Sequence, residues 1–472
     1  MKFISIRSIL FFVFICSITC SYSQNTLRLK KGEVIDSLKV PSSKGIYSIY
    51  LPKSFDLNSG WPVLFGFDSA RNQNALTNTF KKSAEEFGYI VVVSDYGESL
   101  SSEDKSSYIS LFIKHIVSLF PIQNKRMYVF GTGKDAPLNT SLPLLYEQFE
   151  GVIAIGNSYN YSQKLNRNNY FSYVGMVGNK NFRSLDFEDT NKYLRKKGAV
   201  SEVYVFNGNE ELPPPNIIAK ALPHFTMAAM AKGTIPKDSI WIENRYQKDR
   251  ELVSLLKEEK KYLQAYDELT KMRSRYRLFL NVDNLKEEQK EIRKVDDYKK
   301  ERRLRSKYQN QEIFLRQSLF FSMEEDIELN QYGNLGWWQY KIGELEKIHK
   351  NKEIYASNMV IRIKGFLKNV LSDYKKEVIN YKKEEDRKIF LNILSTIVDK
   401  NDFESYRNII SLSTIDNDNE TALFYLEKML QQGYKDIDKL YAIEGTLALR
   451  VSKEYNGIIK QYLGTSKYFN FD

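Results

Sequence analysis

The sequence predicts an α/β fold with a mostly parallel sheet, followed by an all-helical region. Three observations lead to this prediction. Short apolar runs alternate with helix-like segments over the first half of the chain, which is typical of parallel sheets with helices on both faces. Several of these runs are apolar throughout, as strands buried on both faces are. Beyond Trp241 the 472-residue chain has no proline, and Lys, Glu, Leu, Tyr and Ile dominate in helical spacing.

Residues 1–23 have the features of a secretory signal. Lys2 and Arg7 give a positively charged start, and an apolar run follows over 9–18. The triplet at 21–23, Ser-Tyr-Ser, is a small-x-small cleavage site. The apolar run is too short to span a bilayer. We therefore expect an exported protein with no transmembrane segment after signal removal. It would be located either in the periplasm or outside the cell, including at the cell surface.

Both cysteines, Cys16 and Cys20, lie inside this segment. The mature chain would therefore hold no disulfide, no thiolate metal site and no cysteine nucleophile. Lipid attachment at Cys20 is an alternative interpretation. It would require Leu three residues earlier and a small residue directly before the cysteine, and the chain has Ser17 and Thr19 there.

Composition and charge narrow the class of protein. A hydrophobic fraction of 42% with 14% aromatic residues supports packed cores. The formal charge of +11 falls to +9 when Lys2 and Arg7 are removed, and a basic balance favours acidic partners or anionic surfaces. Most of this charge sits in helical segments rich in both signs, so a solvated helix surface is the favoured interpretation. No nucleic-acid partner is expected.

The strands expected in the first half end at prolines, glycines or polar residues. They lie at 45–52, 61–68, 89–94, 127–130, 152–156, 173–178 and 200–206. Apolar residues at three- and four-residue spacing predict the helices between them. These lie at 78–87, 107–120 and 185–197.

The stretch Gly131-Thr132-Gly133 stands at the centre of this half. An apolar strand leads into it and a helix-like segment follows, which is the layout of a nucleophile elbow. The elbow pattern is G-x-S-x-G, and its third position carries the nucleophile. Here that position is Gly133, which has no side chain. The same glycines partly match a phosphate-binding turn, but the third glycine of that motif is missing. We therefore expect no cofactor and no metal.

The ordered series of motifs resembles the α/β-hydrolase fold, in the branch of secreted esterases and polyhydroxyalkanoate-depolymerase-like proteins. The segments that carry this resemblance lie at 49–52, 61–71, 84–89, 128–136 and 149–154. Together they extend over roughly residues 40–235. The resemblance implies a catalytic serine, acid and histidine.

The serine position falls on Gly133, the acid on Asn181 and the histidine on Glu210. Acyl transfer needs an oxygen nucleophile, a base that takes its proton near neutral pH, and a group that orients the base. Glycine supplies no nucleophile, and a carboxylate of ordinary pKa is a poor base for an alcohol. An amide does not stabilise a charged base. The three departures together predict a catalytically inactive hydrolase fold.

Other serines and threonines could supply a nucleophile. Thr132 stands one residue before the elbow position and would point elsewhere. Ser69, Ser94 and Ser158 follow or end predicted strands, where catalytic groups often lie, but none has an evident histidine partner in the sequence. We expect Asp135 to favour the start of the elbow helix, with Lys134 as its neighbour, in a structural role.

The chain has three histidines. His115 lies on a predicted amphipathic helix, where a packed or surface role is favoured over catalysis. His224 falls about fourteen residues past the expected catalytic position. His349 lies among lysines on a later helix and is expected at the surface.

The second half predicts helices at 252–269, 287–308, 311–326, 356–374, 385–398, 403–410, 421–432 and 436–451, with one more beginning at 335. Trp337 and Trp338 are expected as core anchors. The helix–Gly–helix form around Gly433 resembles tetratricopeptide-like arrays, although a clean period of about 34 residues is not evident.

The chain therefore divides into a signal at 1–23, an α/β-hydrolase-like domain at 24–240 and an all-helical domain at 241–472. The leading hypothesis is a secreted inactive hydrolase fold that acts as a binding or scaffold module, with a protein or peptide partner on the helical domain. The alternative is a serine esterase on ester-linked carbohydrate, lipid or peptide. A third hypothesis is binding to anionic glycans or membrane surfaces through the basic helices.

Overall fold

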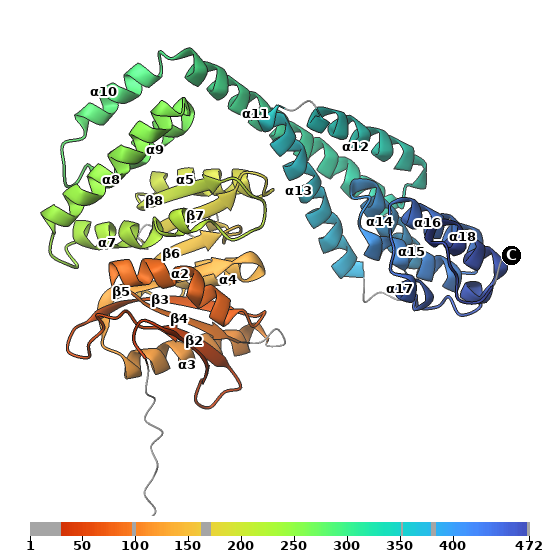
Figure 1. Cartoon of the computed structure of the whole chain (residues 1–472), viewed down its shortest axis with the longest axis horizontal. Helices are drawn as coiled ribbons and strands as arrows, with labels where there is room; N and C mark the ends of the chain where they lie inside the picture. The colour runs from red at the N-terminus through yellow and green to blue at the C-terminus, as the bar shows by residue number, and fades with distance from the viewer. Residues whose placement is uncertain (1–29, 97–100, 162–170, 351–352, 379–383, 470–472) are drawn as a thin grey trace, which may run out of the picture.

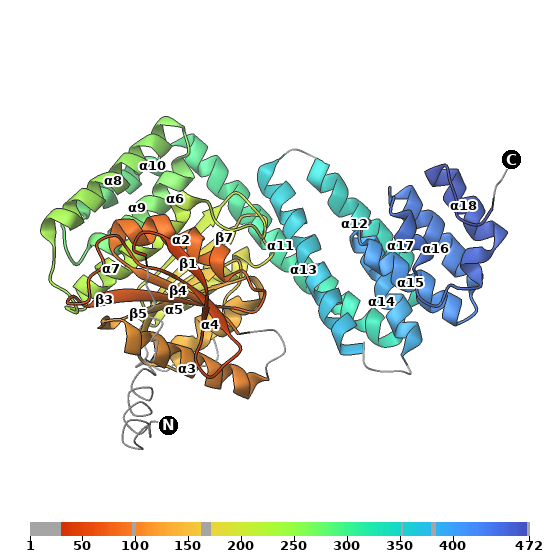
Figure 2. The same cartoon turned by 60° about the horizontal axis from the view of Figure 1, so that its bottom comes forward.

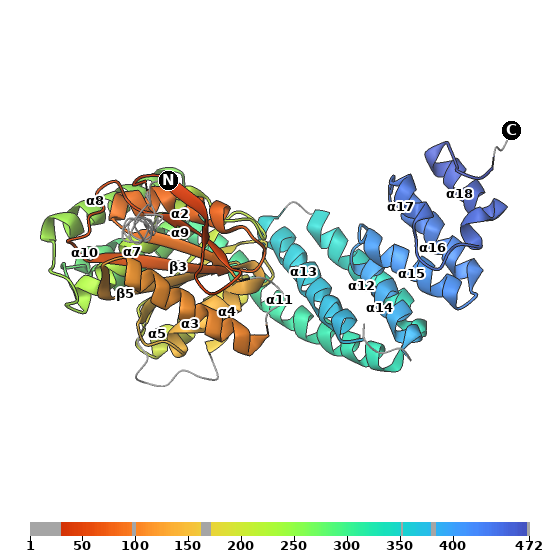
Figure 3. The same cartoon turned by 90° about the horizontal axis from the view of Figure 1, so that it is seen from below.

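The computed structural model describes residues 30–96, 101–161, 171–350, 353–378 and 384–469. The predicted signal at 1–23 lies outside these ranges. Figure 1 shows a sheet flanked by helices and, beyond it, an elongated array of helices. Figures 2 and 3 show the same division from other sides, with the array from α12 (Leu335–Lys350) to α18 (Lys453–Leu463) extending away from the sheet.

One eight-stranded sheet forms the first part, with strand order β1-β2-β4-β3-β5-β6-β7-β8. The first two pairs in this order are antiparallel and all others are parallel. The strands are β1 (Val34–Lys39), β2 (Ile46–Tyr50), β3 (Trp61–Asp68), β4 (Ile90–Asp95), β5 (Ile122–Thr132), β6 (Phe149–Ile155), β7 (Ser172–Gly178) and β8 (Ser201–Phe206). The prediction of a mostly parallel sheet is confirmed.

The apolar sequence of β4 shows how the sheet lies between two layers. Ile90 and Val92 belong to one buried cluster, while Val91 and Val93 belong to the other. Successive residues of a strand point to opposite faces, so a strand covered on both sides is apolar throughout. The covering helices are α3 (Ser102–Leu119) and α5 (Ser184–Lys196) on the first face, and α2 (Gln73–Phe87) and α7 (Ala221–Ala231) on the second.

The first part differs from the prediction at β1 and at the starts of α2, α3 and β5, the last of which begins at Ile122 and not at 127. β1 is not among the expected strands. It lies at the edge of the sheet with its residues partly exposed, so its sequence has no strong apolar pattern from which a strand could be predicted. α2 and α3 each begin five residues before the expected start. In α3 the first turn is polar, with Ser101 accepting a hydrogen bond from the Asp104 backbone N–H as an N-cap.

A largely helical region follows the sheet, as predicted. Besides α12 and α18 it comprises α8 (Ser239–Glu258), α9 (Tyr262–Tyr276), α10 (Asp283–Ile292), α11 (Asp296–Leu329), α13 (Ile354–Val378), α14 (Glu385–Val398), α15 (Phe403–Ile415), α16 (Asn419–Gln431) and α17 (Ile437–Tyr441). Within the described ranges, no helix combines the length and apolarity that a membrane crossing requires.

Some helix boundaries were wrongly predicted. The expected helix at 287–308 is split, because Val295 has an extended backbone with φ −69° and ψ 131° between α10 and α11. The expected helix at 311–326 belongs to α11, which continues until Asn330 adopts the left-handed conformation. The expected helix at 436–451 is α-helical only over α17, with Gly445 at a φ of +78° inside the stretch and a 3-10 turn at Leu449–Val451.

Helix starts recur at a constant interval in the last part of the chain. α14, α16 and α18 begin at Glu385, Asn419 and Lys453, which are 34 residues apart at each step. α15 and α17 begin at Phe403 and Ile437, also 34 residues apart. This is the length of a repeating helical hairpin of the tetratricopeptide kind.

Arg275 of α9 ties the helical part to the sheet. Its side chain is 6% exposed, and its Nε and Nη2 donate to Glu202 of β8 at 3.1 and 2.6 Å. Its Nη1 donates to Asp249 of α8. Burial alone would raise the pKa of Glu202, but the charge of the Arg275 guanidinium, together with hydrogen bonding to His224 and Arg275, outweighs burial and holds that pKa well below its usual range.

The lowered pKa of Glu202 predicts acid sensitivity. A depressed folded-state pKa means that the ionised carboxylate stabilises the fold above the unfolded-state pKa, and that this contribution is lost as the pH falls through the folded-state value. We expect the urea midpoint to be nearly constant between about pH 6 and 8 and to fall below about pH 4.5. Glu202→Gln should show a smaller fall over the acid range. An acid profile identical in both proteins would contradict this assignment.

A second junction joins α11 and α13 to the loop after β7. Glu312 of α11 is completely buried, accepts from Nε of Arg362 at 2.9 Å and lies 2.5 Å from Nη2 of Arg316. Both arginines also reach the loop. Nη1 of Arg362 donates to the Asn179 carbonyl at 2.6 Å, and Nη2 of Arg316 donates to the Phe182 carbonyl at 2.5 Å.

Candidate functional site

The candidate site lies at the carboxyl edge of the parallel strands, where β5 turns into η1 (Gly133–Asp135) and α4 (Ala136–Ser141). A Cβ on Gly131 would stand 2.7 Å from the Cα of Ala136, so strand and helix approach too closely there for any side chain. The Asn139 amide holds α4 to β3 by accepting from the Phe67 N–H at 3.0 Å and donating to its carbonyl at 2.8 Å. The strand–turn–helix layout expected of an elbow is present.

Gly133 occupies the tip of this turn with a φ of +52°. A Cβ added to it would meet no atom within 4 Å. The turn therefore has room for a side chain and carries none. The Gly133 carbonyl accepts a hydrogen bond from the Asn157 side chain, which follows β6, at 3.3 Å.

Asn181 lies on the same edge, in the loop after β7. Its side chain is 3% exposed, and Nδ2 donates to the Gly156 carbonyl at 3.2 Å. Its Oδ1 accepts from the Arg183 backbone N–H at 2.8 Å. Gly156 and Asn157 therefore link Asn181 to Gly133. Both hydrogen bonds of Asn181 connect loops at this edge.

Glu210 is exposed in the loop after β8. Its carboxylate makes no hydrogen bond or ion pair with the part of the chain that the structure describes. The neighbouring Glu211 accepts from the Asn209 backbone N–H and shapes that loop. The structure thus links Gly133 with Asn181, whereas no contact connects Glu210 to them.

The three histidines contact residues outside this edge. His115 on α3 lies 3.5 Å from the Tyr47 hydroxyl of β2. His224 on α7 is buried with Nδ1 3.5 Å from Glu202. His349 on α12 lies 2.9 Å from the Ser357 hydroxyl at an exposed helix pair. That serine–histidine contact belongs to the helical part and not to the elbow.

A buried polar cluster beside the elbow is absent from the sequence-based expectations. Asp135 accepts from the Ser69 backbone N–H at 3.0 Å, from the Ser69 hydroxyl at 2.9 Å, and from the Tyr96 hydroxyl. Burial raises the pKa of Asp68, and the like charges of Asp135 and Asp95 add to that rise. Ser69 was a candidate nucleophile, and its hydroxyl donates to a carboxylate instead of an imidazole.

The other candidate serines are also engaged in structural contacts. The Ser94 hydroxyl lies 2.6 Å from the Tyr108 hydroxyl, and the Ser158 hydroxyl accepts from Tyr173 at 3.2 Å. Neither contacts a histidine in the described residues. Across the described ranges, no group of three or more His, Cys, Asp or Glu side chains is arranged to hold a metal ion.

A cavity of about 420 Å³ opens next to the elbow, between the segment after β6 and α5. Amide, carboxylate and guanidinium groups line it together with aromatic rings. Its principal side chains are Asn157, Tyr159, Arg183, Asp186, Thr190 and Tyr193. Such a mixture suits a polar ligand that presents hydroxyl groups and a flat face. Asn157 connects this cavity to Gly133.

The chain has an α/β part built on a mostly parallel sheet, followed by a largely helical region. No protein-family model matches it, and no curated protein matches it in sequence. Fluorophosphonate-binding serine hydrolase F of Staphylococcus aureus aligns with 41% of this chain and 97% of its own length, at 10% identity and a TM-score of 0.35. A ferulic acid esterase aligns with 41% and 98% at 15% identity and a TM-score of 0.34. Est1E from Butyrivibrio proteoclasticus aligns with 42% and 99% at 9% identity and a TM-score of 0.33.

Proposed function

We propose that this is an exported, catalytically inactive α/β-hydrolase-like protein that serves as a binding or scaffold module. The observation that carries the proposal is the elbow at Gly133, a turn with open space for a nucleophile and no side chain to fill it. The helical part provides the surface for a protein or peptide partner. The signal-like segment at 1–23 supports export.

The placement of acids and bases supports inactivity. General-base activation of a hydroxyl requires a base within about 3 Å of it. His115 and His224 contact Tyr47 and Glu202, and His349 lies beside Ser357 on the helical part, away from the elbow. The Ser69 hydroxyl donates to Asp135. A carboxylate of ordinary pKa removes a serine proton poorly at neutral pH. The alternative of a serine esterase gains no support from these contacts.

The 34-residue interval of helix starts supports a partner-binding role. Helical hairpins stacked at this interval build continuous surfaces on which other chains dock. Four of the five helices that start at this interval are capped at their N-terminus by a side chain that accepts from the backbone N–H three residues later. These caps are Asp402, Asp418, Asp436 and Ser452.

The proposal is tested by ester hydrolysis with residues 24–472 and an activated short-chain ester such as p-nitrophenyl acetate. We expect no turnover above the rate without protein, because none of the described residues form a nucleophile–base pair at the cavity beside the elbow. Saturable turnover that survives repeated purification would contradict the proposal and favour the esterase alternative.

Gly133→Ser restores the hydroxyl at the elbow and is expected to stay inactive, because no histidine is there to accept its proton. The serine would have to adopt the left-handed backbone of Gly133, so we expect this variant to be less stable by about 1 kcal/mol. The matched control is Gly233→Ser, since Gly233 also has a positive φ, of +73°, and open space around it. Turnover by Gly133→Ser alone would show that a base is available, contrary to this account.

A further inference from the structure

A second cavity lies at the opposite, amino edge of the sheet. It has a volume of about 210 Å³ and is formed where the segment before β8 meets α5, α7 and the end of α9. Val200 lines it directly before β8 begins, whereas Gly133 follows the end of β5. In parallel strands these positions lie at opposite edges, so this cavity is separate from the elbow.

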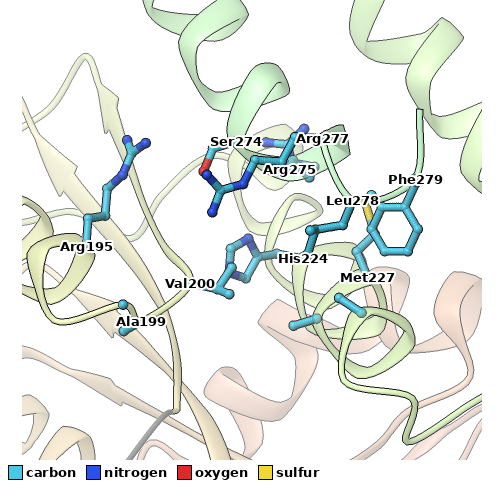
Figure 4. A pocket seen from close by; sticks show the side chains of 13 residues that line it. Arg195, Ala199, Val200, His224, Met227, Ser274, Arg275, Arg277, Leu278 and Phe279 are labelled. Carbon is cyan, nitrogen blue, oxygen red and sulfur yellow. The ribbon is translucent and has the colours of Figure 1, made fainter. Parts of the chain in front are cut away.

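The walls of this cavity are apolar and its charged groups are basic. Figure 4 shows His224 and Met227 from α7 facing Arg275, Leu278 and Phe279, with Arg195 across the opening. The lining contains three arginines and no carboxylate. Arg275 is already paired with Glu202 and Asp249.

Arg195 and Arg277 differ from Arg275 because both are exposed. Neither forms an ion pair or hydrogen bond with any described residue. Two guanidinium groups without carboxylate partners at one opening attract anions and repel cations. A guanidinium also offers a planar pair of donors that matches a carboxylate.

His224 gives a second, independent observation. Its ring is 2% exposed and lines the cavity. Nδ1 lies beside Glu202 at 3.5 Å, while Nε2 is buried without a hydrogen-bond partner in the described part of the chain. Buried polar atoms without partners are uncommon, and a ligand that hydrogen-bonds to Nε2 in the cavity would satisfy this one.

We propose that this cavity binds a small monocarboxylate with an apolar body. The volume exceeds that of an apolar cavity of about 150 Å³ that accommodates benzene, so an aromatic ring with a short carboxylate arm fits it. The ring would pack on Met227 and Leu278, and the carboxylate would pair with Arg195 and Arg277. This inference goes beyond the proposed function and does not depend on the elbow.

The test is a ligand-observed NMR titration of residues 24–472 with phenylacetate, and with phenylacetamide as the uncharged analogue of the same shape. We expect phenylacetate to bind at least about tenfold more tightly, because an ionised hydrogen-bond partner contributes about 1.5–3 kcal/mol. The double variant Arg195→Gln with Arg277→Gln should lose this preference. Arg303→Gln, an exposed arginine of α11 that does not line the cavity, should keep it.

Two results would overturn the proposal. Equal binding of the acid and the amide would mean that the arginines do not bind the ligand and only offset the partial negative charge at the C-terminal ends of α5 and α9. Absence of binding to either compound at millimolar concentration would mean that the cavity is not a ligand site. Ala231→Leu, which enlarges a cavity-lining side chain, should block phenylacetate while leaving the unfolding midpoint near that of the unmodified protein.

Discussion

Replacement of Arg275 by Met is expected to lower the free energy of unfolding by about 3–5 kcal/mol. The Arg275 side chain is 6% exposed and contacts Glu202, Asp249 and the Tyr204 hydroxyl. Methionine keeps much of the side-chain volume but leaves two buried carboxylates without their main counter-charge. An unpaired buried charge costs far more than the pair itself contributes. Urea unfolding followed by circular dichroism measures the loss.

Arg277→Met is the matched control for this prediction. It removes the same charge two residues away, where the side chain is exposed and has no ion-pair partner in the described residues. Its effect should lie within about 0.5 kcal/mol of zero. If both variants unfold at the same urea concentration, Arg275 is not the anchor between α9 and the sheet.

Glu312→Gln is expected to cost about 3 kcal/mol and to loosen the helical part from the sheet. The fully buried Glu312 carboxylate neutralises Arg316 and Arg362, whose guanidiniums also donate to the carbonyls of Phe182 and Asn179. Glutamine keeps the shape and removes the charge, so two buried cations would lose their counter-ion. Hydrogen exchange of the backbone amides at 179–183 should become faster.

The comparison variant is Glu325→Gln, on the exposed side of the same helix. It should change neither the stability nor the exchange at 179–183. In Glu312→Gln the amides of β3 and β5 should keep their protection, because those strands lie inside the sheet core. Uniform acceleration across the sheet would indicate global destabilisation and would contradict a local junction.

The sheet was predictable because its strands are apolar on both faces, and such runs stand out in a sequence. β1 escaped prediction because an edge strand carries polar residues. In the helical part, the turn at Val295 has no glycine or proline to mark it, so its position depends on tertiary packing. The helix starts repeat every 34 residues, but the types of the buried residues do not. For example, Ala422 in α16 corresponds to Asn456 in α18.

The positions of Gly133 and Asn181 at one sheet edge followed from the motif order alone. The hydrogen bonds of Asp135 to Ser69 and Tyr96 did not, because the partners are far apart in the chain and no local pattern links them. The same holds for Arg275 with Glu202 and for Arg362 with Glu312. Such pairs form when the fold brings distant segments together, so the junctions between the two parts become visible only in the structure.

We propose that no serine in this protein is activated for acyl transfer. The most direct measurement is reaction of residues 24–472 with a fluorophosphonate probe, followed by mass spectrometry of the peptides. We expect no labelled residue at neutral pH, because the elbow carries no serine and the described residues show no serine–histidine–carboxylate arrangement. The serine that lies beside an imidazole, Ser357 next to His349, belongs to an exposed helix pair. A single stoichiometrically labelled serine, lost when the protein is unfolded before the reaction, would contradict the account and would identify the nucleophile of an active hydrolase.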